Sequence, residues 1–334
     1  MQKLMLAVAG LVLLLLAVGF ALPRESRFVV SATVDAPAAT VFVLVNDPRR
    51  IQLWSALAGD DAEPSYSGPR DGIGATMAWD SPASGRGTLT IVDSRPWNAV
   101  ELRLNEGDAG EATTWFELVP GTGTTEVRWG FAHDYGFNVV GRYVGLLATG
   151  ILRRDYVNRL GKLKDLAESL PRADFGNLDV ERVDVAGTPL VAMTFTAAPD
   201  PDAVASALDR AYFDISQYID RSGLQVTGPP RLILRDFVGS LRSFDAAIPV
   251  ALATETPPPD ERIRIIHSYS GPALKVIHTG AYARLGDTHR SIAAYLAAAG
   301  IDRAGAPWES FVSEPADVPE SARVTEIYYP LDAD

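Results

Sequence analysis

The chain has 334 residues, contains no cysteine and carries a formal net charge of −12 at pH 7. This length exceeds that of one typical domain and suits two, each with its own hydrophobic core. The acidic balance, without any dense cluster of Lys and Arg, argues against nucleic-acid binding. The lack of cysteine excludes disulfides, thiolate nucleophiles and cysteine-ligated metals.

An apolar segment follows Lys3 at the start of the chain. Residues 4–22 form an unbroken run of nineteen apolar residues, long enough to span a membrane as a helix. The alternative is a cleaved secretory signal, since Gly19-Phe20-Ala21 is an acceptable small-x-small cleavage site. Signal sequences usually have a shorter apolar region, which favours an uncleaved anchor over residues 1–23. In either case we expect the soluble part to lie outside the cytoplasm.

Strands and helices are grouped rather than alternating over the next part of the chain. Residues 28–35 alternate like a strand, Asp35-Ala-Pro37 is typical of a helix cap, and a second short helix is expected near residues 48–57. Residues 63–135 are β-rich runs separated by glycine turns. A long amphipathic helix is predicted over residues 139–169. Its apolar residues at helical spacing are Val140, Val144, Leu147, Ile151, Tyr156, Leu160, Leu163 and Leu166.

This order predicts an α+β layer in which a curved antiparallel sheet covers one long helix. Residues 28–169 resemble the SRPBCC (START-like, polyketide-cyclase-like) helix-grip superfamily. The resemblance rests on Val34-Asp-Ala-Pro37, on Asp47-Pro48 with Trp54-Ser55, and on Leu160-Gly-Lys-Leu-Lys-Asp-Leu166. It implies a hydrophobic ligand cavity under the long helix and carries over no catalytic residue. The tryptophans of this segment could line that cavity, or they could simply build the β-core, which is the preferred interpretation.

A duplication is visible after a linker over residues 170–177. Val185-Ala-Gly-Thr-Pro-Leu190 parallels Tyr269-Ser-Gly-Pro-Ala-Leu274, and Ser222-Gly-Leu224 parallels Ala299-Gly-Ile301. Asp245 and Glu326 stand at the same distance before a proline. These parallels predict a second domain over residues 178–332, built from two β-α-β-β repeats at about 178–250 and 262–331 and joined by residues 256–260.

The second half resembles the GyrI-like effector-binding fold, which also serves as the sensor domain of AraC-type and multidrug-binding regulators. The resemblance is strongest in His278-Thr-Gly-Ala-Tyr282, in residues 299–307 and in Thr325-Glu-Ile-Tyr-Tyr-Pro330. It implies a cleft between the repeats, floored by Glu326 and walled by aromatic residues. Some relatives only bind ligands, and others hydrolyse reactive cyclopropane-bearing electrophiles with a glutamate and a tyrosine.

Glu326 is the preferred site residue. Strand alternation puts Tyr328 on the same face and sends Thr325 and Ile327 to the other. A carboxylate among rings and little water would have a raised pKa and could act as a counter-ion or as a general acid/base. An exposed acid on an edge strand is the alternative. The remaining candidate ligand-binding residues are Tyr282, Trp308, Phe311, Tyr328 and Asp245.

Each of these candidates has a structural alternative. Tyr282, Trp308 and Phe311 could belong to the core, and Asp245 is better interpreted as a trace of the duplication than as a second pocket acid. The family usually has a tyrosine where Phe311 stands, an aromatic residue at His289 and a tryptophan at Tyr295. These differences weaken a transferred hydrolase mechanism, whose tyrosine would have to be Tyr282 or Tyr328. The four histidines show no metal-ligand spacing, so neither a metal nor a cofactor is expected.

The sequence therefore favours a membrane-tethered protein that binds a hydrophobic or cationic organic ligand in an apolar helix-grip cavity and in an acidic, aromatic cleft. One alternative is a hydrolase of a hydrophobic electrophile, with Glu326 and Tyr282 or Tyr328 in catalytic roles. A third reading is a protein-interaction module, as the name of the gyrase-inhibitor family suggests.

Overall fold

A computed structural model of the chain describes residues 2–59, 61–82, 85–107, 110–238, 240–252, 260–313 and 317–332. Two compact units divide the chain: residues 1–176 with 293–300, and residues 177–292 with 301–334. Of the segment expected to join the two repeats, only Asp260 is described, and the rest lies outside the described residues.

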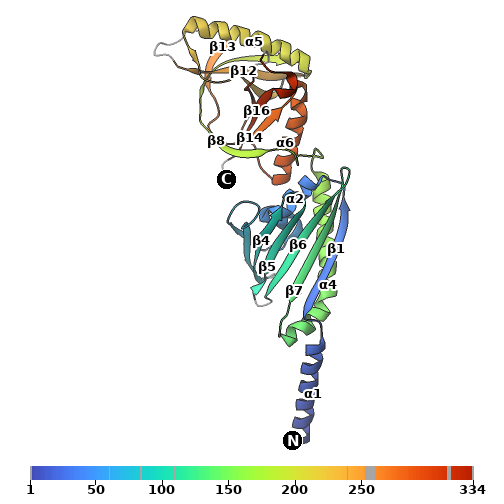
Figure 1. Cartoon of the computed structure of the whole chain (residues 1–334). Helices are drawn as coiled ribbons and strands as arrows, with labels where there is room; N and C mark the ends of the chain where they lie inside the picture. The colour runs from blue at the N-terminus through green and yellow to red at the C-terminus, as the bar shows by residue number, and fades with distance from the viewer. Residues whose placement is uncertain are drawn as a thin grey trace. The chain divides into compact units, whose positions relative to one another are not determined.

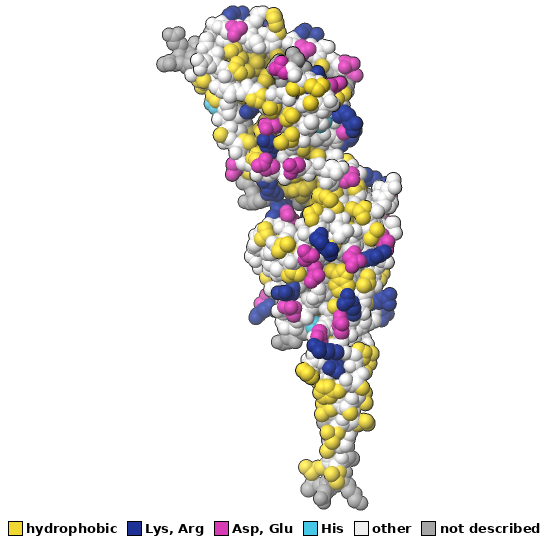
Figure 2. Space-filling model, in the orientation of Figure 1, with side chains coloured by type: hydrophobic (Ala, Val, Ile, Leu, Met, Phe, Trp, Pro, Cys, Tyr) yellow, Lys and Arg dark blue, Asp and Glu magenta, His cyan; other side chains and the backbone are white. Residues whose placement is uncertain are grey.

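The first unit begins with the apolar helix α1 (Gln2–Ala21). Its stretch Leu4–Ala21 has a mean hydropathy of 2.8 and is only 7% buried. Figure 2 shows the apolar side chains that cover its surface. The helix is long and apolar enough to cross a membrane, and a signal sequence near an N-terminus has the same properties.

A seven-stranded antiparallel sheet follows, with strand order β1-β7-β6-β5-β4-β3-β2. Neighbours in the chain are neighbours in the sheet, except that the first strand returns to pair with the last. The strands are β1 (Glu25–Val34), β2 (Ser65–Ser67), β3 (Thr76–Ser81), β4 (Gly85–Arg95), β5 (Ala99–Asn105), β6 (Glu111–Pro120) and β7 (Thr125–Asp134).

Two short helices, α2 (Ala38–Asn46) and α3 (Pro48–Ser55), connect β1 to β2. The side chain of Asp47 caps α3 by accepting a hydrogen bond from the backbone N–H of Arg49. The N-cap of α2 is Pro37, the last residue of the expected Asp35-Ala-Pro37 cap, and no side chain bonds to that end of the helix. Asp35 instead pairs with Arg172 at 2.8 Å.

The long helix α4 (Val139–Ser169) coincides with its predicted range. The side chain of Asn138 begins it by accepting a hydrogen bond from the N–H of Gly141. The sheet runs along this helix (Figure 1), and Tyr156, Leu160 and Leu163 are buried between them. The predicted class is confirmed: the chain is α+β, with a curved antiparallel sheet, a long helix after it and a second β-rich unit.

The second unit contains one sheet with strand order β13-β9-β12-β11-β15-β16-β14-β8, while β10 pairs only with β12. Its strands are β8 (Val180–Val185), β9 (Pro189–Ala197), β10 (Gln225–Val226), β11 (Arg231–Val238), β12 (Leu241–Ala251), β13 (Ile263–His267), β14 (Gly271–Thr279), β15 (Trp308–Phe311) and β16 (Val324–Pro330). Its helices are α5 (Pro201–Ser222), η2 (Tyr282–Arg284), η3 (Glu320–Ala322) and the first part of α6 (Leu285–Ala299), whose residues from 293 onward belong to the first unit.

This strand order shows the duplication directly. Strands β8, β9, β11 and β12 of the first repeat correspond, in this order, to β13, β14, β15 and β16 of the second. When each strand is swapped with its counterpart, the same strand order results, read from the opposite edge of the sheet. The centre of the symmetry is the pair β11–β15, where Leu232 lies opposite Glu309. Both repeat helices end at a left-handed glycine, Gly223 with φ 61° and Gly300 with φ 60°. Each repeat therefore adds one further strand before the β-α-β-β pattern expected from the sequence.

Both helices pack on the same face of this sheet. Residues of β9 and β12 that point to this face, such as Val191, Ala246 and Ile248, form a core with Ile215 of α5. On the other repeat, Thr288 and His289 of α6 bond to side chains of β14 and β16. The opposite face of the sheet carries the polar and aromatic residues described below.

Candidate ligand pocket on the helix-free face of the second sheet

A pocket of about 220 Å³ lies on the helix-free face of the second unit. It forms where β11, β15 and β16 lie side by side, and the loops after β8 and β13 border it. Its lining residues are Val185, Ala186, Pro229, Arg231, Ser268, Tyr269, Trp308, Ser310, Glu326 and Tyr328. The fold thus brings together segments that are far apart in sequence.

Strand register explains why these side chains meet. Residues opposite each other in neighbouring antiparallel strands point to the same face of a sheet. One row across the sheet contains Glu326, Ser310 and Arg231, and the adjacent row contains Tyr328 and Trp308. Thr325 and Ile327 point to the other face and are completely buried, as alternation predicts.

Glu326 has two close partners. Its Oε1 lies 2.8 Å from Nζ of Lys275, and its Oε2 accepts a hydrogen bond of 2.7 Å from the hydroxyl of Tyr328. Lys275 belongs to β14, where it lies directly opposite Tyr328. The carboxylate is therefore held at both oxygens and is not a free acid on the floor of the pocket.

These partners shift the ionisation of the whole group. Burial raises the pKa of Glu326, but the hydrogen bonds from Lys275 and Tyr328 and the nearby positive charges outweigh burial, so its pKa lies below the usual value. The expectation of a raised pKa is wrong, because it took no account of Lys275. The hydrogen bond from Lys275 to Glu326 raises the pKa of this lysine. Burial, with the hydrogen bond to Glu326, raises the pKa of Tyr328 to about 12.

Aromatic rings form one wall of the pocket. Trp308 stacks on Tyr328 with ring centroids 4.9 Å apart and an interplanar angle of 9°. Tyr269 lies beside Trp308 at 6.4 Å, and its hydroxyl is anchored to the carbonyls of Pro272 and Leu331. The wall is therefore rigid, since backbone hydrogen bonds and ring stacking fix it.

Arg231 adds a second positive charge next to Glu326. Burial lowers the pKa of its guanidinium, which stays well above neutral pH. Its Nε is buried and has no hydrogen-bond partner among the described residues. Glu326 and Arg231 line the pocket, Lys275 pairs with Glu326, and Glu181 of β8 lies opposite Lys275 on the same face.

Asp245 occupies the position in the first repeat that Glu326 occupies in the second. Asp245 lies opposite Ile233 of β11, and Glu326 lies opposite Ser310 of the equivalent strand β15. The surroundings differ, because Asp245 is completely buried between Arg235 and Arg264 and accepts a hydrogen bond from Thr194. It does not line the pocket at Glu326.

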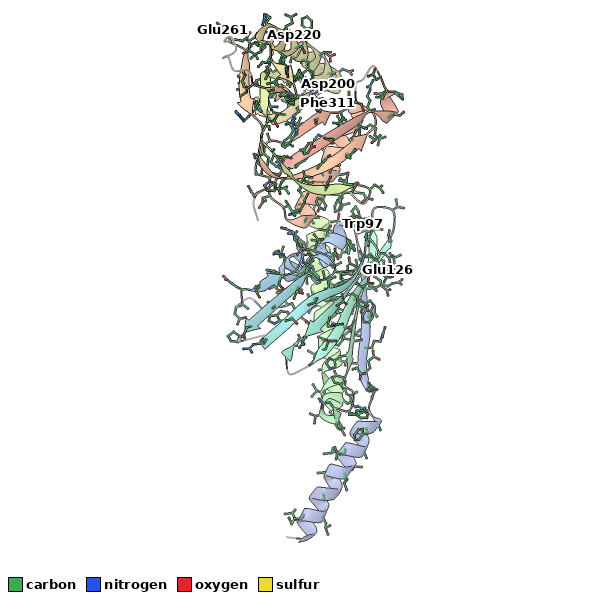
Figure 3. The ribbon with its side chains drawn as sticks, turned by 60° about the vertical axis from the view of Figure 1, so that its left-hand side comes forward. Trp97, Glu126, Asp200, Asp220, Glu261 and Phe311 are labelled. Atoms are coloured by element: carbon green, nitrogen blue, oxygen red, sulfur yellow. The ribbon has the colours of Figure 1, made fainter. Side chains whose placement is uncertain are left out.

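Two other candidate residues lie on the opposite face. Phe311 is three positions after Trp308 on a strand, so it points toward α5, where it packs on the cluster of Leu232 and Leu234. Figure 3 labels it near Asp200, at the start of that helix. Tyr282 packs against Phe311 at 5.3 Å, with Arg323 over its ring. The structure thus groups Glu326, Tyr328 and Trp308, and separates them from Tyr282, Phe311 and Asp245.

The interior of the first unit is filled by aromatic rings. Trp129 stacks on Tyr156 of α4 at 4.0 Å and packs against Trp54 and Phe116 at 5.3 and 5.1 Å. Trp54, Trp79 and Trp129 are buried in the core, in agreement with the β-core interpretation. A ligand in this layer would have to displace rings. Four buried polar atoms of this unit have no hydrogen-bond partner among the described residues: Thr40 Oγ1, Arg50 Nε, Ser55 Oγ and Trp79 Nε1.

Sequence reasoning missed Lys275, Arg231 and Tyr269. Lys275 stands between Leu274 and Val276, both buried, so strand alternation alone places it on the face opposite to the helix-packed core. Its partner could not be derived, since the pairing of β14 with β16 depends on the topology of the sheet. The same applies to Arg231, which belongs to the other repeat. No group of three His, Cys, Asp or Glu side chains that could hold a metal was found within the described ranges.

Three comparisons relate the chain to known proteins. Residues 25–168 match the family model described as "Polyketide cyclase / dehydrase and lipid transport". A comparison with curated proteins finds no match. Among solved structures, the C-terminal domain of EcmrR is 16% identical, with a TM-score of 0.41, and the match covers 47% of this chain and 99% of that one.

Two further solved structures are similar to parts of the chain. A hydrolase from Listeria innocua is 12% identical, with a TM-score of 0.34, covering 46% of this chain and 91% of the other. A norcoclaurine synthase from Thalictrum is 13% identical, with a TM-score of 0.34, covering 43% of this chain and 94% of the other. The family match covers residues 25–168, the helix-grip segment.

Proposed function

We propose that the chain is a membrane-tethered protein that binds a small aromatic molecule in the pocket around Glu326. The observation that carries this proposal is the combination of a paired, half-buried carboxylate with a fixed aromatic wall. Pockets of this kind usually combine apolar walls with a few oriented polar groups. Glu326, Lys275, Tyr328 and Arg231 are those polar groups, and the Trp308–Tyr328 stack is the wall.

The charged groups around the pocket indicate which kind of ligand it would bind. A lone carboxylate would favour a cation, but Lys275 already neutralises Glu326 at 2.8 Å. Arg231 lines the pocket and supplies a second cation that acts on Glu326. We therefore propose a flat aromatic ligand that carries a carbonyl or an acid group. A cationic ligand would first have to displace Lys275 from Glu326.

The first unit supports a second hydrophobic binding role. The family that matches residues 25–168 is described by cyclases, dehydrases and lipid transport, all of which handle apolar small molecules. The unpaired atoms of Thr40, Ser55 and Trp79 are buried donors that an entering ligand could use. The aromatic filling means that such a ligand would enter only as rings move aside.

Contacts at the end of α1 support an anchor over a cleaved signal. Arg142, at the start of α4, is buried and donates a hydrogen bond of 2.9 Å to the carbonyl of Phe20. The hydroxyl of Tyr143 donates to the carbonyl of Leu15 at 2.8 Å. Cleavage after Ala21 would remove both acceptors and leave the Arg142 guanidinium with fewer partners in a buried position, which is costly. The helix is thus built into the first unit.

A hydrolase is the second candidate function, because Tyr328 bonds to Glu326 as an acid/base pair would. The lowered pKa of Glu326 and the raised pKa of Tyr328 argue against it. Both groups stay in one protonation state near neutral pH, whereas a general acid/base works best when its pKa lies near the working pH. The geometry fits recognition better than proton transfer.

The test is a titration of the full chain in detergent or nanodiscs with anionic, neutral and cationic aromatic dyes of similar size. We expect the anionic dye to bind most tightly, and Arg231→Gln to weaken it about tenfold, as for a lost charged hydrogen bond. Asp220→Asn, an exposed carboxylate of α5, is the matched control. Equal affinities in Arg231→Gln, Glu326→Gln and the control would refute the site. Turnover of an electrophile panel that disappears in Glu326→Gln would establish the hydrolase instead.

A further inference from the structure

An apolar stripe on the first half of α4 has no cover among the described residues. Phe137 precedes the helix, and the other members follow at intervals of three or four, which places them on one face. The exposed fractions of their side chains are large: Phe137 87%, Val140 73%, Val144 55%, Leu147 78% and Ile151 66%. We call these five residues the α4 stripe. Large apolar side chains that are exposed side by side mark an interaction surface.

The stripe is not an extension of the core face. In the second half of α4, Tyr156, Leu160 and Leu163 are buried against the sheet. In the first half, the buried positions are Arg142 and Gly145. Gly145 allows the ring of Tyr135 to approach, since a Cβ there would lie 2.4 Å from that ring. The stripe therefore points away from the sheet, and something outside this unit must cover it.

The stripe begins where α1 ends. Arg142 Nη1 bonds to the carbonyl of Phe20, and Tyr143 Oη bonds to that of Leu15. Gly19 permits this contact, because a Cβ there would lie 2.2 Å from Cγ1 of Val139. The first turns of α4 thus run beside the last turns of α1.

This contact fixes the depth of the stripe relative to α1. Leu15 lies six residues before the end of α1 at Ala21, which corresponds to about 9 Å along a helix axis. Helices that lie in the membrane interface place their apolar face about 5–10 Å into the boundary between headgroups and acyl chains. If α1 spans the bilayer, the Tyr143 hydroxyl lies at that depth and Val139, against Gly19, lies nearer the end of α1. Thr149, which bonds to Ser26, already lies past that end.

Basic residues mark both ends of this region. Arg24 and Arg27 follow α1, where they pair with Asp134 and Glu25, and Arg153 and Arg154 follow Ile151; all four are exposed. Figure 2 shows basic side chains where α1 meets the first unit. Arginines at the edge of an apolar segment extend to the headgroups and are attracted to anionic lipids. An apolar stretch with basic residues at both ends is typical of a segment that enters and leaves the membrane interface.

We propose that the first turns of α4, residues 137–144, lie in the interfacial layer of the bilayer that α1 crosses, with Phe137, Val140 and Val144 of the α4 stripe against the acyl chains. This rests on the proposed membrane tether and adds a second contact to it. A single span leaves a domain free to swing. A helix that also lies in the interface holds the first unit at a fixed orientation to the membrane.

The absence of cysteine makes a direct test possible. Single cysteines at Leu14, Val140, Val144 and Leu147 of the full chain receive a nitroxide label, and the protein is reconstituted in liposomes that contain anionic lipid. Leu53 of α3 is the matched control, since it is 64% exposed and apolar but lies on another helix. The ratio between the accessibility of each label to oxygen and its accessibility to a water-soluble nickel complex reports the depth of that label in the bilayer.

We expect the label at Leu14 deep in the bilayer and the labels at Val140 and Val144 about 5–10 Å below the phosphates. The label at Leu147 should lie closer to the phosphates, and the label at Leu53 in water. In Val144→Glu/Leu147→Glu, the label at Val140 should move into water, while Leu53→Glu leaves it unchanged. A deep label at Leu14 with stripe labels in water would overturn the interfacial contact and leave the anchor intact. If the label at Leu14 and the labels on the stripe were all in water, the anchor itself would be overturned. Spin–spin broadening that disappears when labelled protein is diluted with unlabelled protein would show that a second copy of the chain covers the stripe, which would overturn the contact with lipid.

Discussion

Lys275 Nζ lies 2.8 Å from Glu326 Oε1, and this pair decides which charge a ligand meets in the pocket. The two side chains come from adjacent strands, β14 and β16, and are about three-quarters buried. Partial burial strengthens their attraction relative to a surface ion pair. Lys275 neutralises the negative charge of Glu326. The positive charge of Arg231 in the pocket lining then remains to pair with an acid group of a ligand.

Removing Lys275 should reverse the preference for ligand charge. In Lys275→Met, Glu326 loses its closest cation, so its pKa rises and its carboxylate becomes available to a cationic ligand. We expect affinity for a cationic dye to increase about fivefold and affinity for an anionic dye to fall by a similar factor. Fluorescence titration at pH 7 measures both. Lys162→Met, on the exposed side of α4, should change neither; an unchanged dye preference in Lys275→Met would contradict the role of the pair.

Glu326 should also contribute to stability in a pH-dependent way. Its folded pKa lies below its unfolded value, so its contribution is fully present above about pH 4.5 and is lost as the pH falls through the folded pKa. Glu326→Gln should therefore flatten the acid limb of the stability curve. Urea unfolding from pH 6 to pH 2 measures it, with Asp220→Asn as control. A steeper acid loss in Glu326→Gln would reverse the assigned sign.

Strand alternation was enough to predict on which face the neighbours of Glu326 in its own strand lie. It placed Tyr328 beside Glu326 and sent Thr325 to the other face, and both placements hold. It could not pair Glu326 with Lys275, because that contact requires the β14–β16 register. The three shared motifs indicated a duplication, yet they could not reveal that Asp245 is completely buried while Glu326 lines a pocket.

The long helix shows a different limit of sequence reasoning. Apolar spacing predicted α4 with correct ends, but periodicity identifies a face and not what covers that face. Tyr156 and Leu160 pack on the sheet, while Val144 and Leu147 of the same pattern are exposed. The difference arises because α4 continues past the buried part of the sheet toward α1, a fact that only the three-dimensional arrangement contains.

Asp245 should matter for stability and not for binding. It is completely buried between Arg235 and Arg264, so Asp245→Asn leaves two guanidinium groups without their anion. We expect a loss of about 3 kcal/mol in the free energy of unfolding, against less than about 1 kcal/mol for Glu326→Gln. Urea unfolding at pH 7 measures both, and dye affinity should survive in Asp245→Asn. Equal destabilisation by the two variants would contradict the asymmetry of the repeats.

Tyr328 should ionise unusually late. Its pKa of about 12 lies above that of a free tyrosine, so the folded protein holds this proton more tightly than the unfolded chain. The resulting stability is complete below about pH 10 and is lost as the pH rises through the folded pKa. Tyr328→Phe should remove one late-ionising group from the ultraviolet titration at 295 nm. Loss of an early-ionising group instead would mean that Glu326 does not hold the hydroxyl.

Two glycine-to-alanine substitutions in the first unit should act with opposite sign. Gly87 of β4 lies opposite Trp79 of β3, and a Cβ at Gly87 would lie 2.2 Å from the buried indole ring. The ring cannot retreat without moving the core, so Gly87→Ala should cost about 1–3 kcal/mol. Gly161 of α4 has open space around it, and Gly161→Ala should stabilise by up to about 1 kcal/mol, because alanine favours the helix. Thermal unfolding compares the two; a neutral Gly87→Ala would show that Trp79 has room to move, and the buried Trp79 Nε1 would then be within reach of a ligand.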